Sequence, residues 1–145
     1  MRLRVLLALA ASAVLLTSCG SSDSGPTGRE GSPPSASDLD GNSYTSVEVT
    51  GHKLVDESEI TLTFKDDNLG VNGGCNTMTA GYEVTDGTVK WTGPAASTMM
   101  ACSDELTAQD AWLTSLFTDG VDATLENSTL VLSGPDNEEI VLETD

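Results

Sequence analysis

Few residues in this chain can carry acid–base, nucleophilic or redox chemistry: one histidine, His52, and three cysteines, Cys19, Cys75 and Cys102. A Ser-His-Asp or Cys-His catalytic set would have to use His52, which lies in a Gly-His-Lys segment between two expected strands. No Gly-x-Ser-x-Gly segment is present to expose a nucleophile. We therefore interpret His52 as a surface turn residue and expect no catalytic residues and no enzyme activity.

Metal and redox chemistry are the next possibilities. A zinc site built from His52, Cys75 and Cys102 lacks a fourth ligand and the close spacing of structural zinc motifs. Cys102 directly precedes an expected helix, which could lower the pKa of its thiol, but the chain has no Cys-x-x-Cys pair. The acidic residues are scattered among turns, without a calcium-type Asp-x-Asp-x-Asp-Gly loop. The sequence predicts no metal and no cofactor.

Sulfur and aromatic side chains offer two further hypotheses. Met99 and Met100 could sense oxidation, but such a pair more often places one side chain in a core. Trp91 and Trp112 could line a ligand surface, but with only two tryptophans in the chain we expect both to be core anchors.

The N-terminus has the form of an export signal. Arg2 and Arg4 precede an apolar run over residues 5–16, which is shorter than the roughly 17–25 residues that span a bilayer. Residues 16–20, Leu-Thr-Ser-Cys-Gly, resemble the lipobox of bacterial lipoproteins. This resemblance implies a signal peptide over residues 1–18 and a lipid on the sulfur of Cys19, with palmitate among its acyl chains. The alternative is an ordinary secretory signal with an accidental cysteine.

The charge of the chain limits its partners. The formal net charge is −17, and removal of residues 1–18 leaves 4 basic against 23 acidic residues, so 4 − 23 = −19. Such a surface repels phosphate backbones, so we expect no nucleic-acid binding, and membrane attachment through the lipid alone. Residues 19–37 are rich in Gly, Ser and Pro and are expected to be a flexible tether to a domain over residues 38–145.

Apolar residues alternate with polar ones through most of the expected domain, which predicts about eight short strands with one buried face. Clear examples are Ile60-Leu62-Phe64, Val89-Trp91, Leu130-Leu132 and Ile140-Leu142. Hairpin turns are expected at residues 66–68, 86–87, 127–128 and 134–137.

One segment, residues 103–119, has the period of a helix. Its apolar stripe consists of Leu106, Leu113, Leu116 and Phe117, with Trp112 at the margin. Ser103 can cap the helix and Gly120 can end it. We therefore expect an α+β fold, with mostly antiparallel strands forming a curved sheet or partly open barrel and one amphipathic helix packed against it.

If Cys19 carries the lipid, Cys75 and Cys102 remain in an exported chain, where disulfides form and persist. The economical interpretation is one Cys75–Cys102 bridge, which in the loop-entropy model stabilises the fold by about 3–4 kcal/mol.

Four motifs in order resemble the META (HslJ-like) domain: Gly-Cys-Asn at 74–76, Gly-Tyr at 81–82, Thr-Met-Met-Ala-Cys at 98–102, and Gln-Asp-x-Trp-Leu at 109–113. The resemblance covers roughly residues 39–143. It departs from the family in the first strand, residues 43–49, which has no tryptophan. The motif residues to which it assigns a structural role are Gly74, Asn76, Gly81, Tyr82, Thr98, Met100 and Ala101.

The resemblance implies a small, β-rich, envelope-associated domain with no established catalytic residues, in a family with members linked to envelope stress or virulence. We therefore expect a non-enzymatic binding or stabilising module, anchored by lipid on the extracytoplasmic side of the cell membrane. Its partner would be an envelope protein. The alternative is a half-barrel whose apolar mouth, near Leu113, Leu116 or Phe117, accepts a lipid tail or a hydrophobic peptide.

Overall fold

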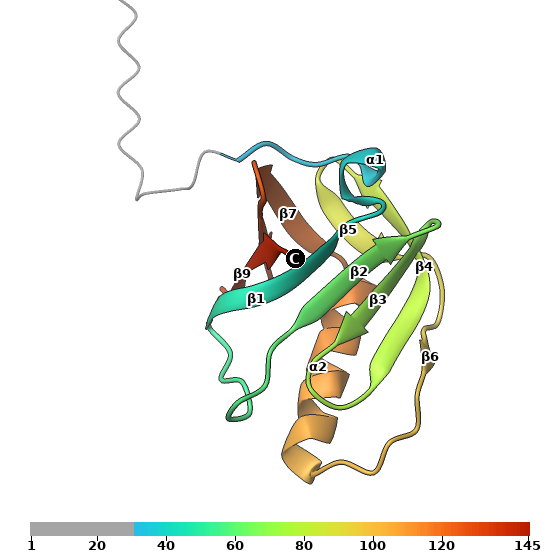
Figure 1. The fold of residues 1–145 in the computed structure, drawn as a ribbon, viewed down its shortest axis with the longest axis vertical. Helices are drawn as coiled ribbons and strands as arrows, with labels where there is room; N and C mark the ends of the chain where they lie inside the picture. Colours follow the sequence, from blue (N-terminus) through green and yellow to red (C-terminus); the bar gives the residue numbers. More distant parts are fainter. Residues whose placement is uncertain (1–30) are drawn as a thin grey trace, which may run out of the picture.

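The computed structural model describes residues 31–145. The expected signal peptide and Cys19 lie outside these residues. The described part contains nine β-strands and two α-helices, arranged as shown in Figure 1. The helices are α1 (Ala36–Leu39) and α2 (Asp104–Asp119). The strands are β1 (Ser43–Thr50), β2 (Thr61–Lys65), β3 (Asn68–Asn72), β4 (Thr77–Thr85), β5 (Thr88–Trp91), β6 (Ala96–Ser97), β7 (Val121–Glu126), β8 (Thr129–Ser133) and β9 (Glu139–Thr144).

The strands form a closed barrel. All pairings between strands are antiparallel, in the order β3-β2-β1-β9-β8-β7-β5-β4, and β3 also pairs with β4. That last pairing runs from Asn68↔Gly81 to Asn72↔Thr77 and joins the two ends of the sheet. The mostly antiparallel fold with a helix is as expected; where a curved sheet or partly open barrel was expected, the β3–β4 pairing closes the ring. The short β6 pairs with β4 outside the ring.

The tight turns lie where the sequence predicts them. The β2–β3 and β4–β5 hairpins each have two central residues at positive φ, Asp66-Asp67 and Asp86-Gly87. This is the backbone of the turns whose twist matches that of paired strands. Asn127 and Asn137 have positive φ in the next two hairpins. The residues of these turns therefore help to fix the register of four strand pairs: β2–β3, β4–β5, β7–β8 and β8–β9.

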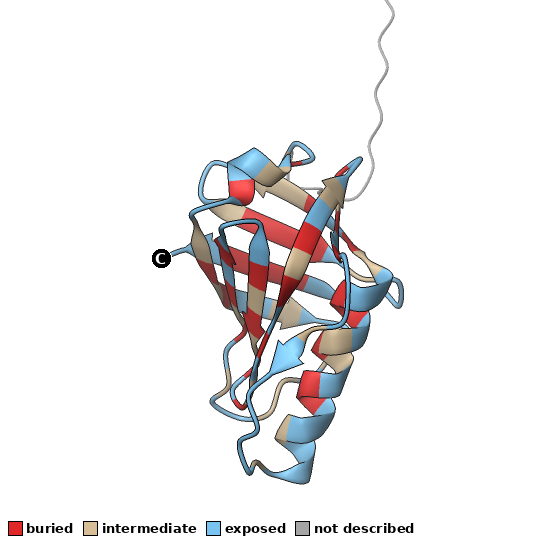
Figure 2. Cartoon of the chain, turned by 90° about the vertical axis from the view of Figure 1, so that its right-hand side faces the viewer, coloured by how far each residue is buried: buried red, intermediate tan, exposed pale blue. Residues whose placement is uncertain are grey.

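Alternate strand residues point inward and form one core together with α2. Figure 2 shows the alternation of buried and exposed positions along the strands. Tyr44 of β1 is buried and meets Phe64 edge-on at 5.9 Å between ring centroids, and Phe64 meets Tyr82 at 5.1 Å. Tyr44 is thus the aromatic residue that β1, which lacks a tryptophan, contributes to the core.

Helix α2 begins and ends at the predicted residues. The Ser103 hydroxyl accepts a hydrogen bond from the Leu106 amide, and Gly120 ends the helix at a φ of 102°. Leu113, Leu116 and Phe117 are buried in the core. No helix in residues 31–145 is long and apolar enough to cross a membrane.

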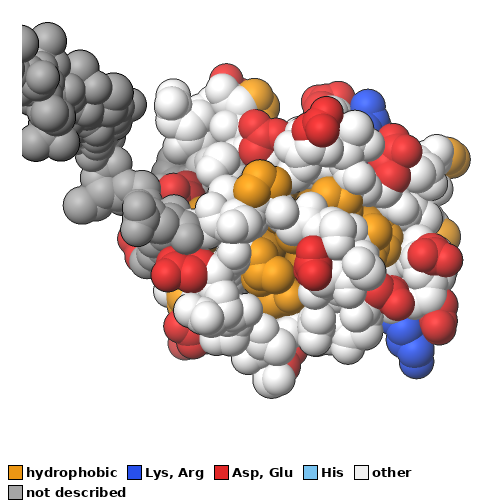
Figure 3. Space-filling model, turned by 90° about the horizontal axis from the view of Figure 1, so that it is seen from above, with side chains coloured by type: hydrophobic (Ala, Val, Ile, Leu, Met, Phe, Trp, Pro, Cys, Tyr) orange, Lys and Arg blue, Asp and Glu red, His pale blue; other side chains and the backbone are white. Residues whose placement is uncertain are grey.

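The segment before β1, which includes α1, covers the end of the barrel that lies opposite the β3–β4 turn. Ser32 and Leu125 exchange backbone hydrogen bonds of 3.1 and 2.8 Å, Leu39 is buried, and the Tyr82 hydroxyl donates to the Ala36 carbonyl. Figure 3 shows this end, with acidic side chains around a central group of hydrophobic ones. Residues 31–37, which the sequence assigns to the tether, therefore contact the barrel.

Candidate functional site

Three of the four motifs lie around the two cysteines: in the β3–β4 turn, in the loop before α2, and in α2 itself. Cys75 lies in the turn between β3 and β4, and Cys102 lies just before α2. The structure joins them in a disulfide with their Cα atoms 6.1 Å apart, within the usual range of about 4.4–6.8 Å. We call residues 73–77 and 98–102, with the first two turns of α2, the disulfide cluster.

Asn76 is the centre of hydrogen bonding in this cluster. Its side-chain amide donates to Asp110 Oδ2 at 2.9 Å, and its backbone amide donates to the same atom at 3.2 Å. Its side-chain oxygen accepts from the Met100 amide at 2.8 Å and from the Thr98 hydroxyl at 3.1 Å. Thr98 in turn accepts from the Thr77 amide. Asn76 therefore ties the β3–β4 turn to both the following loop and the helix.

Gln109 makes a second set of ties from the helix. Its exposed fraction is only 2 %, although it is polar. Its side-chain oxygen accepts from the Val55 amide at 2.8 Å, and its nitrogen donates to Ser58 Oγ and to the Gly73 carbonyl. The helix is thereby fastened to the long β1–β2 loop and to the β3–β4 turn.

Asp110 is buried beside Gln109, and its Oδ1 atom has no hydrogen-bond partner in the described structure. The sequence analysis did not predict burial for either residue. The available signal was their position three and four residues before the buried Leu113, which places them on the inner face of the helix.

The other motif residues are divided between this cluster and the barrel wall. Gly74 has a φ of 101°, and a Cβ atom there would lie 2.9 Å from Ser58 Cβ, so only glycine fits without strain. Gly81 and Tyr82 lie in β4, where Gly81 passes close to Thr92 and Tyr82 is part of the core. Ala101 is exposed within the loop.

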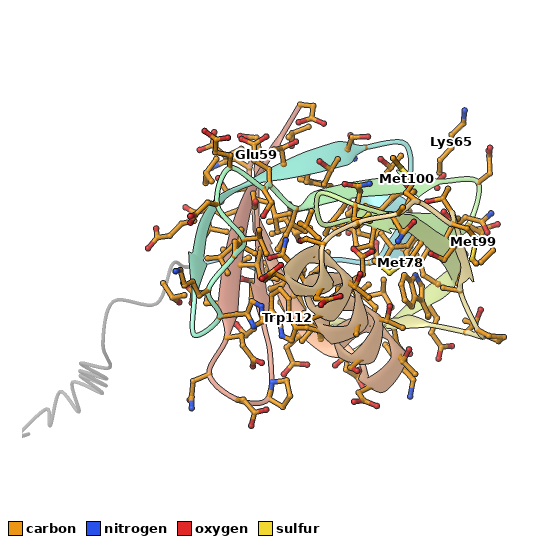
Figure 4. All side chains as sticks on the ribbon, turned by 90° about the horizontal axis from the view of Figure 1, so that it is seen from below. Glu59, Lys65, Met78, Met99, Met100 and Trp112 are labelled. Carbon is orange, nitrogen blue, oxygen red and sulfur yellow. A yellow bond between two sulfur atoms is a disulfide. The ribbon has the colours of Figure 1, made fainter. Side chains whose placement is uncertain are left out.

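Met99 and Met100 are both exposed, with fractions of 97 % and 65 %. The expectation that one of them enters the core is wrong. The loop is held by the backbone of Met100 and by the Cys102 sulfur, so neither methionine side chain is needed to anchor it. Figure 4 labels both residues together with Met78, which is buried in the core.

His52 and Trp112 form a second group at the same end of the barrel. Their rings stack in parallel, 3.7 Å apart between centroids. The Trp112 indole N–H donates to Glu138 Oε1 at 3.3 Å. Trp91 is a core anchor, as expected, but Trp112 is only partly buried and packs against the edge of the core. Within residues 31–145, no side-chain hydroxyl or thiol hydrogen-bonds to His52.

The surroundings of this group shift two pKa values. Burial lowers the pKa of His52, and the neighbouring Glu138 carboxylate opposes this effect only in part. Burial acts to raise the pKa of Glu138, but hydrogen bonds from the Asp136 amide and the Trp112 indole, with the charge of His52, lower it overall. At neutral pH the arrangement therefore favours a neutral imidazole and an ionised carboxylate.

Three hollows lie on the surface rather than inside the barrel. The first, about 710 Å³, lies over the outer faces of β2, β3 and β4. The second lies between His52, the residues that follow it and the start of α2, and the third lies beside it against the β3–β4 turn. None is lined by Leu113, Leu116 or Phe117, so these hollows do not form the expected apolar mouth. In the described residues no group of three or more His, Cys, Asp or Glu side chains is placed to hold a metal.

Comparisons with known proteins agree with this architecture. The META domain model matches residues 37–145, so the chain belongs to the META domain family. The fold is similar to that of a protein from Burkholderia xenovorans solved by NMR, with a TM-score of 0.63 and 19% identity, covering 86% of this chain and 96% of that one. A second NMR structure has a TM-score of 0.59 and 17% identity, covering 76% of this chain and 94% of the other. A comparison with curated proteins found no match.

Proposed function

We propose that this META-domain protein is a lipid-anchored, non-enzymatic binding module on the extracytoplasmic side of the cell membrane, where it serves under envelope stress. The observation that carries the proposal is the Cys75–Cys102 bridge, since disulfides persist in oxidising compartments and are rare in the cytosol. The lipobox-like residues before Cys19 support the same location.

The short stretch of chain between Cys19 and the barrel would keep the barrel close to the membrane. Gly31 is twelve residues after Cys19 (31 − 19 = 12), and at most about 3.6 Å per residue gives a reach of roughly 40 Å. Because Ser32 pairs with Leu125, the chain joins the barrel at the end that carries α1. The disulfide cluster lies at the other end and would point away from the lipid.

The packed interior supports binding on the outer surface. Leu113 and Phe117 have no exposed surface and Leu116 has 5 %, and all three belong to the single core. The alternative function, in which a lipid tail or hydrophobic peptide enters a half-barrel, would require that core to open. A partner of the closed barrel instead meets its outer wall or its loops.

Fractionation of cells tests the anchor. The wild-type chain is expected in the membrane fraction, and the Cys19→Ser chain is expected to be released or to remain uncleaved. A Cys75→Ser, Cys102→Ser double variant is the control, because it alters the other two cysteines and should stay anchored. If the Cys19→Ser chain is processed normally and remains tightly membrane-bound, the anchor assignment is wrong.

Crosslinking in cells, followed by mass spectrometry, tests the binding role. We expect crosslinks from the outer wall or the disulfide cluster to an envelope component, increasing under envelope stress. If crosslinked species are absent under both conditions, while the anchored chain is abundant, the binding role is contradicted.

A further inference from the structure

The hollow over β2, β3 and β4 is lined by polar residues that stand in regular rows. The register of the three strands places Thr61, Asn72 and Thr77 in one row across the wall, and Thr63, Gly70 and Thr79 in the next. These residues line the hollow of about 710 Å³, a volume within the usual range of small-molecule sites, about 300–1,000 Å³. Four threonine hydroxyls and the carboxamides of Asn68 and Asn72 thus surround a central position, Gly70, that has no side chain.

Nothing in the fold requires glycine at that central position. Gly70 lies in the middle of a strand without a positive φ, and the nearest atoms to a Cβ placed there are Thr79 Oγ1 at 3.5 Å and the Thr63 carbonyl oxygen at 3.8 Å. These are ordinary contacts, unlike those at Gly74. Glycine inside a strand costs about 0.5–1 kcal/mol relative to alanine. It marks a bulge, a tight bend of a barrel, or a close approach of a ligand or another backbone, and the register runs through Gly70 without a bulge. The effect of Gly70 is to keep the hollow open.

The floor of the hollow is preorganised by the disulfide cluster. The Asn72 side-chain amide donates to Thr77 Oγ1 at 3.1 Å, and its oxygen accepts from the Gly74 amide at 2.9 Å. The Thr77 amide donates to Thr98 Oγ1 at 3.0 Å. The polar atoms at this end of the hollow are therefore fixed in position before a ligand arrives, which lowers the entropy cost of binding.

The chemistry of the lining selects the ligand. Threonine hydroxyls and an asparagine carboxamide both donate and accept hydrogen bonds, which suits a ligand rich in neutral hydroxyl or acetamide groups. The only charged lining residues are Lys65 and Asp66, of opposite sign, at one end, and the formal charge of −17 opposes anions. An added peptide strand is disfavoured because β2, β3 and β4 are each paired on both sides, leaving no free edge along the hollow.

We propose that this hollow binds a neutral saccharide, held by the threonine hydroxyls and Asn72 over the bare backbone of Gly70. The inference rests on the proposed function in one respect, since saccharides of the cell envelope would be the accessible source. It extends that function by assigning the ligand class and the surface.

Amide NMR shifts of the full chain test the site directly, in a detergent whose headgroup is not a sugar. Two neutral disaccharides, maltose and N,N′-diacetylchitobiose, serve as probes, and the anionic glucose 6-phosphate serves as the charge control. We expect saturable shifts at Gly70 and along β2–β4 with at least one disaccharide, and none there with the anion. If neither disaccharide gives saturable shifts there, or if the shifts map to another surface, the proposal is overturned.

Substitutions give the matched test. Gly70→Val fills the centre of the hollow with a residue suited to strands, and we expect an unchanged or higher unfolding temperature with binding weaker by about tenfold or more. Thr63→Val and Thr79→Val remove hydroxyls at nearly constant shape and should also weaken binding. Thr129→Val, on β8 away from the hollow, is the control and should leave binding unchanged.

If Gly70→Val fails to fold, the two threonine variants decide the question. Full binding in Gly70→Val, or in Thr63→Val and Thr79→Val together, contradicts the assignment. Failure of saccharide binding would leave the membrane fractionation result unaffected, so the two proposals fail separately.

Discussion

Asn76 binds Asp110 twice, donating to Oδ2 from both its backbone amide and its side-chain amide, at 3.2 and 2.9 Å. The two residues are 34 positions apart, and Asp110 is largely buried. The pair therefore holds a turn of the barrel to the middle of a helix that follows it much later in the chain. Because buried polar groups are costly to leave unpaired, this contact should have a large effect on stability.

Replacing Asn76 tests the contact. Asn76→Ala removes the side-chain bonds to Asp110, Met100 and Thr98, and we expect the free energy of unfolding to fall by about 2–4 kcal/mol. Asn68→Ala is the matched control, because its one side-chain bond, to the Asp66 carbonyl, lies in an exposed turn. Urea denaturation measures both variants. An equal loss for the two would show that the Asn76 network adds nothing.

The disulfide gives a second prediction. Cys75→Ser with Cys102→Ser opens a loop whose ends are 27 positions apart, and this should lower the free energy of unfolding by about 2–5 kcal/mol. The wild-type chain should lose a similar amount in reductant, while the double variant should be insensitive to it. Free thiols at both positions in protein purified without reductant would contradict the bridge.

Glycine at position 74 is predicted to be irreplaceable. Gly74→Ala forces a side chain into a positive-φ conformation and against Ser58, so we expect a loss of stability above about 1 kcal/mol. Gly93→Ala is the control, since a Cβ there has no neighbour within 4 Å and φ is not positive. The melting temperature of Gly74→Ala should be clearly lower than that of Gly93→Ala, and equal melting temperatures would refute the strain at Gly74.

The fold could be predicted from the sequence only where the signal is local. The hairpin turns and the two ends of α2 are specified by neighbouring residues, such as Asp86-Gly87 and Ser103. Closure of the barrel could not be predicted, because it needs pairings between strands that are distant in the chain, β1 with β9 and β5 with β7. The Asn76–Asp110 contact was hidden because helical spacing places Asp110 on the inner face of α2 but does not identify its partner, which lies 34 positions away.

His52 predicts a dependence of stability on pH. Its pKa is lowered in the folded state, so the unfolded chain binds the proton more readily. Stability is therefore lost as pH falls through histidine's ordinary value of 6.5. The lowered pKa of Glu138 acts in the same direction below its ordinary value of 4.5. When pH falls from 7.5 to 5.5, the free energy of unfolding measured in urea should fall more for the wild type than for His52→Gln. An equal dependence on pH in the two proteins would contradict this.

The exposed methionines predict a pattern of oxidation. Dilute hydrogen peroxide should convert Met99 and Met100 to sulfoxides while Met78, with an exposed fraction of 3 %, stays reduced. The folded barrel should survive, because neither exposed side chain belongs to the core. Peptide mapping by mass spectrometry shows which methionine is oxidised first, and early oxidation of Met78 would show that the core opens.

The pairing of β1 with β9 also determines when the protein can fold. β1 is among the first strands made, yet one of its two partners is the last, with Tyr44 opposite Thr144 and Thr45 opposite Glu143. Until β9 has been made, β1 keeps one unpaired edge, which is a template for aggregation. Contacts between such distant residues slow folding, because the loop between them must close first. The newly made chain would therefore depend on protection until β9 emerges.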